Sequence, residues 1–218
     1  MASAPSLLCA LLALAGHVSQ VQAITRGLIS PSSHLAVPPG GVALSWSNRT
    51  QSATQRAGIL LDNMLMDEKR RMLHGSCMGC PYVGHIPGIP RLGIPPLNLH
   101  DGPQGFRNEP LAKGTSTSWP GAMAMAATFD TQAVYEWGYA MGAEFRAKGA
   151  NVQLGPGLNV ARIPRNGRNF EYLAGEDPLL GYSLAKQVVK GIQEHKVMAC
   201  AKHYVGNSQE ANRMDVSE

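Results

Sequence analysis

The chain has 218 residues, of which 44% are hydrophobic and 16% are charged, a composition typical of globular proteins rather than disordered or collagen-like ones. Its 19 basic and 15 acidic residues leave a net charge of +4 with no basic run, which argues against a nucleic-acid partner. The 24 glycines and 15 prolines make the chain rich in turns and exclude a simple helical bundle or coiled coil. By its length the chain holds one domain or part of one.

The N-terminus has the pattern of a secretory signal. An apolar run, Leu7–Gly16, is followed by the small-residue cleavage pattern Val21–Ala23. The run is shorter than the roughly 20 apolar residues that span a bilayer, so we expect cleavage and no stable membrane span afterwards. The sequence therefore predicts a signal peptide over residues 1–23 and a secreted, extracellular protein. The sequon Asn48-Arg49-Thr50 agrees with secretion and predicts glycosylation at Asn48.

The segment after the signal is irregular before the first helices begin. Residues 24–50 are rich in polar residues, proline and glycine, and are predicted to form an N-terminal arm leading into a domain over residues 51–218. Apolar side chains on one side predict a helix over Ala53–Leu65, and a shorter helix is predicted over Asp67–Leu73. Glycine and proline recur through Gly75–Pro96, which predicts a long irregular loop that packs against or covers a site.

Short apolar runs then alternate with helical patterns. Four runs are predicted to be strands: Pro96–Leu99, Ala122–Thr128, Asn151–Leu154 and Val197–Ala201. One helix is predicted to begin after the N-cap Asp130 and to end at Gly149, and another to begin at Asp177-Pro178. Both helices carry a buried apolar stripe at three- and four-residue steps: Val134, Trp137, Met141 and Phe145 in the first, and Leu180, Leu184, Val188 and Ile192 in the second.

Alternation of strands and helices with short connections predicts parallel βαβ units, and hence an α/β fold. Polar and glycine-rich sequences follow the strands, and the chemistry of parallel α/β folds lies at these strand ends. No Gly-x-Gly-x-x-Gly pattern opens a helix, which argues against a dinucleotide cofactor. A closed barrel takes about 250 residues, and about four or five strands are indicated here. The prediction is therefore an incomplete (β/α)8 TIM-type barrel, roughly its first half, in a truncated chain.

Charged side chains at three predicted strand ends form the candidate site. Asp101 and Arg107 follow the first strand, Arg168 lies on a loop between a strand and a helix, and Lys202 and His203 follow the last strand. Individually these residues also fit a turn cap, solvated loop charges or a histidine bonded to backbone. Together they suit a hydroxyl-rich ligand, because a carboxylate accepts hydrogen bonds while Arg, Lys and His donate them. Their spacing indicates no metal site.

Five motifs, in this order and spacing, resemble one known family. They are Arg91–Leu97, Asp101–Pro103, Gly167–Glu171, Glu176–Pro178 and Ala201–Asn207. They are similar to the N-terminal barrel domain of glycoside hydrolase family 3, of the β-glucosidase type, and the resemblance runs from about Ala53 to the end. It implies a retaining, exo-acting glycosidase that hydrolyses terminal non-reducing β-glucosyl residues of a β-linked glucoside or oligosaccharide, without a cofactor.

The resemblance also assigns roles to residues. Asp101, Arg107, Arg168, Lys202 and His203 match positions that bind the hydroxyls of the non-reducing-end sugar. Such contacts tighten as the sugar ring approaches an oxocarbenium ion. The family's aspartate nucleophile lies on a later strand and its acid/base carboxylate in the following domain, so both are expected beyond Glu218. The chain as given is therefore predicted to be inactive.

Several alternatives remain. The Cys77-x-x-Cys80 spacing is compatible with a local disulfide, a thiol oxidoreductase or, with His74 and His85, a zinc site, and the pairing of Cys77, Cys80 and Cys200 is open. Within the family, a β-xylosidase competes. The N-acetylhexosaminidase motif has a second histidine that is lacking after His203, which excludes that type. A non-catalytic sugar-binding pseudoenzyme is the remaining alternative.

Overall fold

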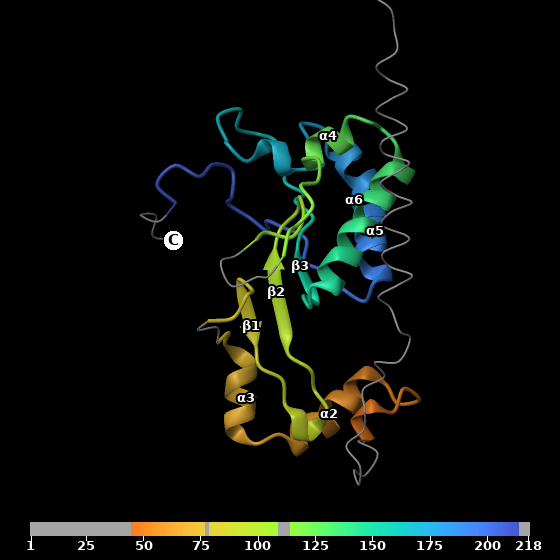
Figure 1. The fold of residues 1–218 in the computed structure, drawn as a ribbon, viewed down its shortest axis with the longest axis vertical. Helices are drawn as coiled ribbons and strands as arrows, with labels where there is room; N and C mark the ends of the chain where they lie inside the picture. The colour runs from red at the N-terminus through yellow and green to blue at the C-terminus, as the bar shows by residue number, and fades with distance from the viewer. Residues whose placement is uncertain (1–44, 77–78, 109–113, 214–218) are drawn as a thin grey trace, which may run out of the picture. The chain divides into compact units, whose positions relative to one another are not determined.

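The computed structural model describes residues 45–76, 79–108 and 114–213, which belong to one compact unit, Ala43–Glu218. The predicted signal peptide and most of the predicted arm lie outside the described residues. The elements in chain order are η1 (Ser45–Ser47), α2 (Ala53–Asn63), α3 (Met66–Leu73), β1 (Gly84–Ile86), η2 (Pro90–Leu92), β2 (Leu97–Asp101), α4 (Ala122–Ala126), α5 (Thr131–Ala147), β3 (Val152–Leu154), η3 (Asn169–Glu171), α6 (Pro178–Glu194) and β4 (Met198–Ala199) (Figure 1).

The four strands form one open sheet whose order, β1-β2-β3-β4, follows the chain. β1 is antiparallel to β2, whereas β2, β3 and β4 are mutually parallel. His100 on β2 lies opposite Gln153 on β3, which lies opposite Ala199 on β4. Helical crossovers through α5 and α6 join the three parallel strands, so the predicted βαβ units are present in a mixed α/β unit.

Two predictions about the strands were wrong. Ala122–Thr128, predicted to be a strand, contains the helix α4, because alternating Ala and Met have high helix propensity and one short apolar run does not distinguish the two states. The segment Gly75–Pro96, predicted to be irregular throughout, contains β1. β1 has only three residues and lies among glycines and prolines, so the alternation of apolar and polar residues that predicts a strand cannot be recognised there. In addition, β2 runs on to Asp101, two residues past its predicted end.

The helices α5 and α6 begin where their caps predict. Asp130 accepts hydrogen bonds from two backbone N–H groups of the first turn of α5, and Asp177 accepts one at the start of α6. The predicted stripes are buried, with Leu180 only partly so. They pack with α4 and the sheet into one core: Phe106, Ala122, Ala126, Val134, Trp137, Met141, Phe145, Ala150, Leu173, Leu184, Val188, Ile192 and Val197.

Glycines allow α5 and α6 to approach each other closely. A Cβ added at Gly138 would lie 2.5 Å from the backbone oxygen of Val188. One added at Gly191 would lie 2.4 Å from the backbone oxygen of Tyr135 and 2.6 Å from the backbone nitrogen of Tyr139. The two helices therefore meet backbone to backbone, and this packing fixes the layer that supports β2 and β3.

The described cysteines have different states. Cys80 is disulfide-bonded, which is incompatible with its acting as a zinc thiolate, while Cys200 is free and exposed. Cys77 lies outside the described residues.

No group of three or more His, Cys, Asp or Glu side chains in the described part of the chain is placed to hold a metal ion. None of the described helices is long and apolar enough to cross a membrane.

Candidate functional site

The site begins at the carboxyl end of β2, where the chain makes a tight turn. The backbone N–H of Gly102 donates to the carbonyl of Gly105 at 2.7 Å, and that of Arg107 donates to the carbonyl of Asp101 at 2.9 Å. Gly105 has φ of +125°, and a Cβ there would lie 2.7 Å from Cδ1 of Trp119. The turn thus needs glycine, and it returns Arg107 to the side of Asp101.

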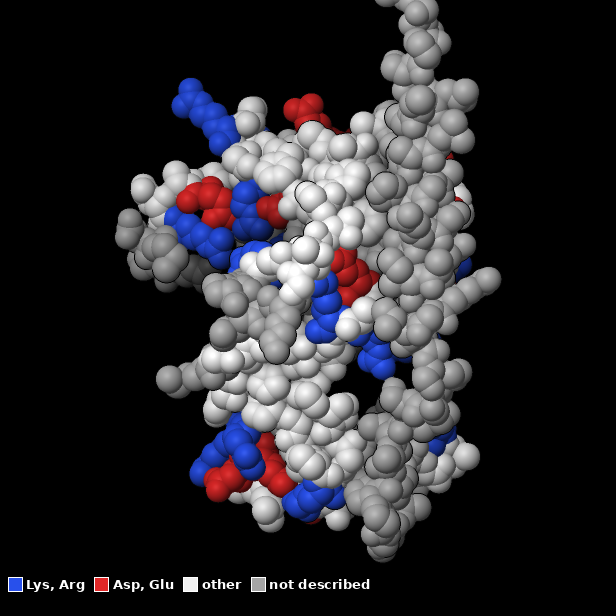
Figure 2. All heavy atoms as spheres, viewed as in Figure 1, with Lys and Arg blue, Asp and Glu red and all other residues white. Residues whose placement is uncertain are grey.

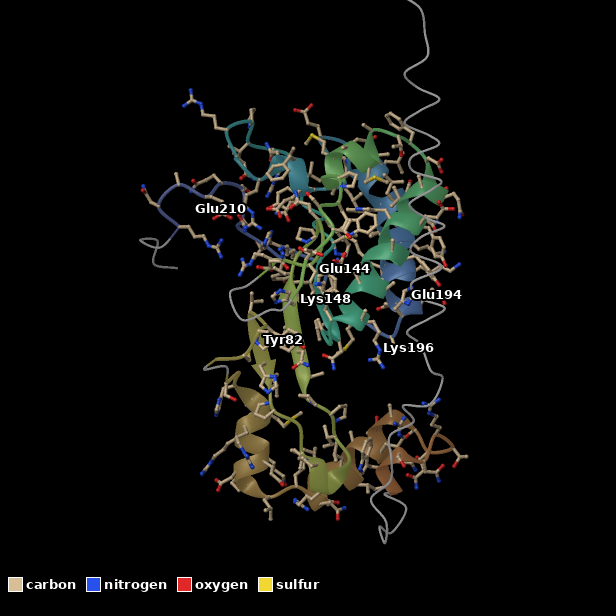
Figure 3. The ribbon with its side chains drawn as sticks, in the orientation of Figure 1. Tyr82, Glu144, Lys148, Glu194, Lys196 and Glu210 are labelled. Atoms are coloured by element: carbon tan, nitrogen blue, oxygen red, sulfur yellow. The ribbon has the colours of Figure 1, made fainter. Side chains whose placement is uncertain are left out.

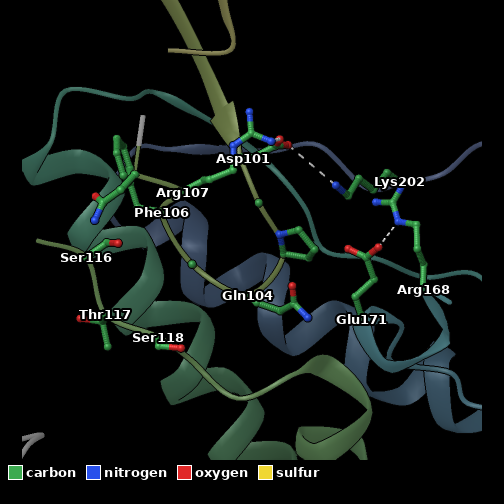
Figure 4. Close-up of a pocket in the computed structure, with 14 residues that line it drawn as sticks. Asp101, Gln104, Phe106, Arg107, Ser116, Thr117, Ser118, Arg168, Glu171 and Lys202 are labelled. Atoms are coloured by element: carbon green, nitrogen blue, oxygen red, sulfur yellow. Dashed lines mark hydrogen bonds and ion pairs between the residues drawn. The ribbon is translucent and has the colours of Figure 1, made fainter. Parts of the chain in front are cut away.

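The carboxylate of Asp101 lies between two cations. Oδ2 is 2.9 Å from Nη1 of Arg107, and Oδ1 is 3.9 Å from Nζ of Lys202 (Figure 4). Lys202 is brought there by backbone pairing beside β3, since its N–H donates to the carbonyl of Pro156 and its carbonyl accepts from Leu158. Burial lowers the pKa of Lys202, and the carboxylate of Asp101 acts in the opposite direction.

Arg168 is fixed by two carboxylates. Its Nε donates to Glu171, three residues on, and its Nη1 donates to Oε1 of Glu210 at 2.6 Å. Burial opposes the charge of Arg168, but the hydrogen bonds to Glu171 and Glu210 outweigh it and raise the guanidinium pKa. The same contact holds the pKa of Glu210 below its usual value. The guanidinium is therefore permanently charged and held in one orientation.

His203 occupies a neighbouring position. Its Nδ1 is 3.1 Å from the hydroxyl of Tyr172, and its backbone N–H donates to Oδ1 of Asn159 at 2.6 Å. Burial, followed by the charges of Arg168 and Lys202, lowers the pKa of His203, which favours the neutral ring. The peptide bonds Asp101–Gly102 and Lys202–His203 are both cis.

Four of the five predicted binding residues line one pocket of about 410 Å³, within the size range of small-molecule sites. Its lining is Asp101, Gly102, Pro103, Gln104, Gly105, Phe106, Arg107, Asn108, Ser116, Thr117, Ser118, Arg168, Glu171 and Lys202. His203 instead lines an adjacent hollow that also contains Glu210 and Arg213. Figure 2 shows positive and negative side chains interspersed on the visible face rather than a patch of one sign.

The wall of the pocket opposite the ion pairs is held by α5. Glu144 accepts from the backbone N–H of Thr117 at 3.0 Å and from Nε1 of Trp119 at 3.2 Å. One turn later, Nζ of Lys148 donates to the carbonyl of Thr115 at 2.6 Å. Figure 3 labels Glu144 on α5 and Lys148 at the C-terminal end of that helix. These bonds anchor the segment that carries Ser116, Thr117 and Ser118, which line the same pocket as the charged side chains.

The motif Gly167–Glu171 contains both Arg168 and its partner Glu171, whereas other members of the site lie outside every motif and were not predicted. Glu210 lies 42 residues from Arg168 and belongs to no motif. Gln104 and the serines and threonine of residues 116–118 gave no signal beyond their polarity. Asn48 is exposed, and its Oδ1 accepts from the N–H and hydroxyl of Thr50 at 3.0 and 2.8 Å. Glycosylation there stays a prediction.

Comparison with known proteins gives consistent matches. Residues 89–216, more than half of the chain, match the family described as "Glycosyl hydrolase family 3 N terminal domain". The chain is 40% identical over 180 residues to "Probable beta-glucosidase F" of Emericella nidulans, covering 81% of this chain and 20% of that protein. It is 36% identical over 193 residues to "Beta-glucosidase BoGH3A" of Bacteroides ovatus, covering 81% of this chain and 25% of that protein.

Solved structures agree. The β-glucosidase DesR from Streptomyces venezuelae, in complex with D-glucose, matches with a TM-score of 0.67 and 41% identity, covering 72% of this chain and 20% of that one. β-Glucosidase 3B from Thermotoga neapolitana, in complex with glucose, matches with a TM-score of 0.63 and 36% identity, covering 70% and 23%. The chain thus spans about a fifth to a quarter of the length of these relatives. The chain belongs to glycosyl hydrolase family 3, and its matched residues are those of the family's N-terminal domain.

Proposed function

We propose that this chain supplies the sugar-binding side of a secreted β-glucosidase that removes terminal β-glucosyl residues. The observation that carries the proposal is the carboxylate of Asp101 flanked by Arg107 and Lys202, with Arg168 lining the same pocket. A carboxylate accepts from two neighbouring hydroxyls, while the cations donate to the remaining oxygens, which is the pattern a pyranose requires. Relatives whose structures are described as glucose complexes support glucose as the sugar.

The pocket is also suited to binding that strengthens during reaction. Its charged groups are already paired with one another, so less ordering is required of them when a sugar binds. As positive charge develops on the sugar ring, a carboxylate near its hydroxyls is favoured more strongly than in the ground state. We therefore propose that these side chains contribute to catalysis through binding, in a partial TIM-type barrel.

Hydrolysis needs two further carboxyl groups. A retaining enzyme places a nucleophile and an acid/base about 5–5.5 Å apart. Among the described residues, two carboxylates line the pocket, Asp101 and Glu171, and each is bonded to a cation, which suits them to binding and orientation. We propose that the 218-residue chain binds the sugar without hydrolysing it, and that residues of the family's later segments complete the reaction. Release of nitrophenol from p-nitrophenyl β-glucoside by the purified chain would refute this.

The binding proposal is tested by calorimetric titration of the full chain with D-glucose. Asp101→Asn is expected to weaken binding by about ten- to a hundred-fold, the usual worth of one charged hydrogen bond. Asp62→Asn is the matched control, because Asp62 is exposed on α2, and it should leave the affinity unchanged. Absence of glucose binding, or equal affinity of Asp101→Asn and the wild-type chain, would overturn the proposal. D-Xylose, which lacks the hydroxymethyl group, distinguishes the β-xylosidase alternative by binding more tightly than glucose.

Secretion is proposed on the apolar run Leu7–Gly16 and the cleavage pattern that follows it. N-terminal sequencing of the protein collected from the medium of expressing cells should begin at Ile24. Retention of the whole chain inside the cells would contradict this proposal.

A further inference from the structure

His100 is a fully buried histidine directly before Asp101 on β2. Both ring nitrogens have partners. Nδ1 is 3.2 Å from the backbone N–H of Val83, and Nε2 is 2.6 Å from the backbone carbonyl of Arg107. Since the N–H of Val83 is a donor, Nδ1 must accept, and the ring proton lies on Nε2, where it is donated to Arg107. The ring is therefore assigned as a neutral tautomer by its two backbone partners.

Aromatic side chains hold this ring in place. Its centroid lies 4.1 Å from that of Phe106, 5.9 Å from that of Tyr82 in an edge arrangement, and 6.4 Å from that of Phe145. Phe106 also lines the pocket. Its ring centroid lies 4.9 Å from Nζ of Lys148, the ammonium group that also bonds the pocket wall. The imidazole thus packs in the core on one side, and on the other side it is bonded to the turn formed by residues 101–107, the pocket turn.

The bond to His100 fixes the end of the pocket turn. The N–H of Arg107 donates to Asp101, and the carbonyl of Arg107 accepts from His100, so the backbone of Arg107 is held on both sides. The side chain of Arg107 is 56% exposed, in contrast to Lys202 at 16%. The guanidinium of Arg107 extends from this anchored backbone to the carboxylate of Asp101.

We propose that His100 is a positioning residue for the sugar site: it sets the backbone of Arg107, and through it the guanidinium that meets Asp101, without touching the sugar. This inference rests on the proposed function for its ligand. Through its two hydrogen bonds, the imidazole links the segment before β1 to the end of the pocket turn. A side chain of equal volume without donor and acceptor would leave the N–H of Val83 and the carbonyl of Arg107 without this bond.

The test compares two substitutions in the full chain. His100→Phe keeps a ring among the aromatic side chains and removes both hydrogen bonds, while His100→Gln retains one donor and one acceptor. D-Glucose binding is expected to weaken about ten-fold in H100F, the equivalent of one hydrogen bond, and by less than about three-fold in H100Q. Melting temperatures establish that both variants fold, and His100→Met replaces H100F if that variant does not.

A double-mutant cycle separates positioning from general destabilisation. If His100 acts through Arg107, then H100F should weaken binding less than about two-fold in an Arg107→Ala background. The proposal is overturned if folded H100F binds glucose as wild type does, or if its loss of affinity is the same with and without Arg107.

A second readout does not depend on the sugar. The Nε–H signal of Arg107 in ¹⁵N spectra should shift in H100F and stay near its wild-type position in H100Q, and an unmoved signal in folded H100F refutes the positioning role. If the wild-type chain binds no glucose but this signal moves as expected, only the proposed function fails. If wild type binds glucose and neither readout responds to H100F, only the role of His100 fails.

Discussion

Gly191→Ala gives a stability test of the close contact between α5 and α6. The added Cβ would lie 2.4 Å from the backbone oxygen of Tyr135 and 2.6 Å from the backbone nitrogen of Tyr139, about 1 Å inside ordinary contact. Backbone atoms cannot rotate away as a side chain can, so the two 17-residue helices must separate. Overpacking of this kind costs about 1–3 kcal/mol or more, against a gain of about 1 kcal/mol from the helix propensity of alanine.

Because the clash involves two backbone atoms, we place its cost at or above the upper end of that range and expect a net loss of about 2 kcal/mol. For a chain of this size such a loss lowers the melting temperature by roughly 4–8 °C. In urea, with a denaturant slope of about 2 kcal/mol per molar, the unfolding midpoint should fall by about 1 M.

Gly58→Ala is the matched control for this experiment. Gly58 also lies within a helix, α2, but no atom of the described residues outside that helix lies within 4 Å of its added Cβ, so the change brings the propensity gain without the clash. It should be neutral or stabilise the chain by up to about 1 kcal/mol. If Gly191→Ala proves as stable as wild type, the helices can move apart freely and the reasoning from the contact distances is refuted.

The helix cap Asp130, the half-buried His203 and the pocket wall give three further expected outcomes. Asp130→Ala removes the acceptor for two N–H groups of α5 and should cost about 1 kcal/mol in urea unfolding, while Asp130→Asn should cost much less; equal losses would contradict the capping role. Because the pKa of His203 is lowered in the folded chain, the unfolded chain binds that proton more tightly and stability rises with pH through the range just below about 6.5. Unfolding free energies at pH 5 and pH 7 should therefore differ less in His203→Gln than in wild type, and an unchanged difference would show that His203 does not contribute. Glu144→Ala should weaken glucose binding by about ten-fold, since it releases the wall held through Trp119 and removes a charged hydrogen bond, whereas Glu136→Ala on the exposed side of the same helix should not.

The two long helices were predicted well because their signals are local. Asp130 and Asp177 cap them, and each carries an apolar stripe that spans several turns, so the sequence within one segment decides the state. The α4 helix and the β1 strand have five and three residues, too few for a period to be measured. Short elements take their state from what they pack against, and that information lies elsewhere in the chain.

The site was predictable in composition and less so in arrangement. Asp101, Arg107 and Lys202 were expected together because parallel strands bring their carboxyl ends to one edge, and they line one pocket. His203 was grouped with them, but its ring contacts Tyr172 and lines the adjacent hollow instead. The role of His100 could not be seen, because its partners are backbone atoms that only the folded turn brings within reach.

The agreement between strand order in space and strand order in the chain has a consequence for synthesis. During synthesis each strand of the described sheet is therefore made after the strand that it pairs with, and none of the described strands has to be inserted between two that are already paired. Asp101 and Lys202 are nevertheless separated by about 100 residues, which at about 5–20 residues per second is a delay of roughly 5–20 s. Arg107 is only six residues later in the chain than Asp101 and is made almost at the same time. The carboxylate of Asp101 therefore has an opposite charge nearby throughout that interval, before Lys202 is made.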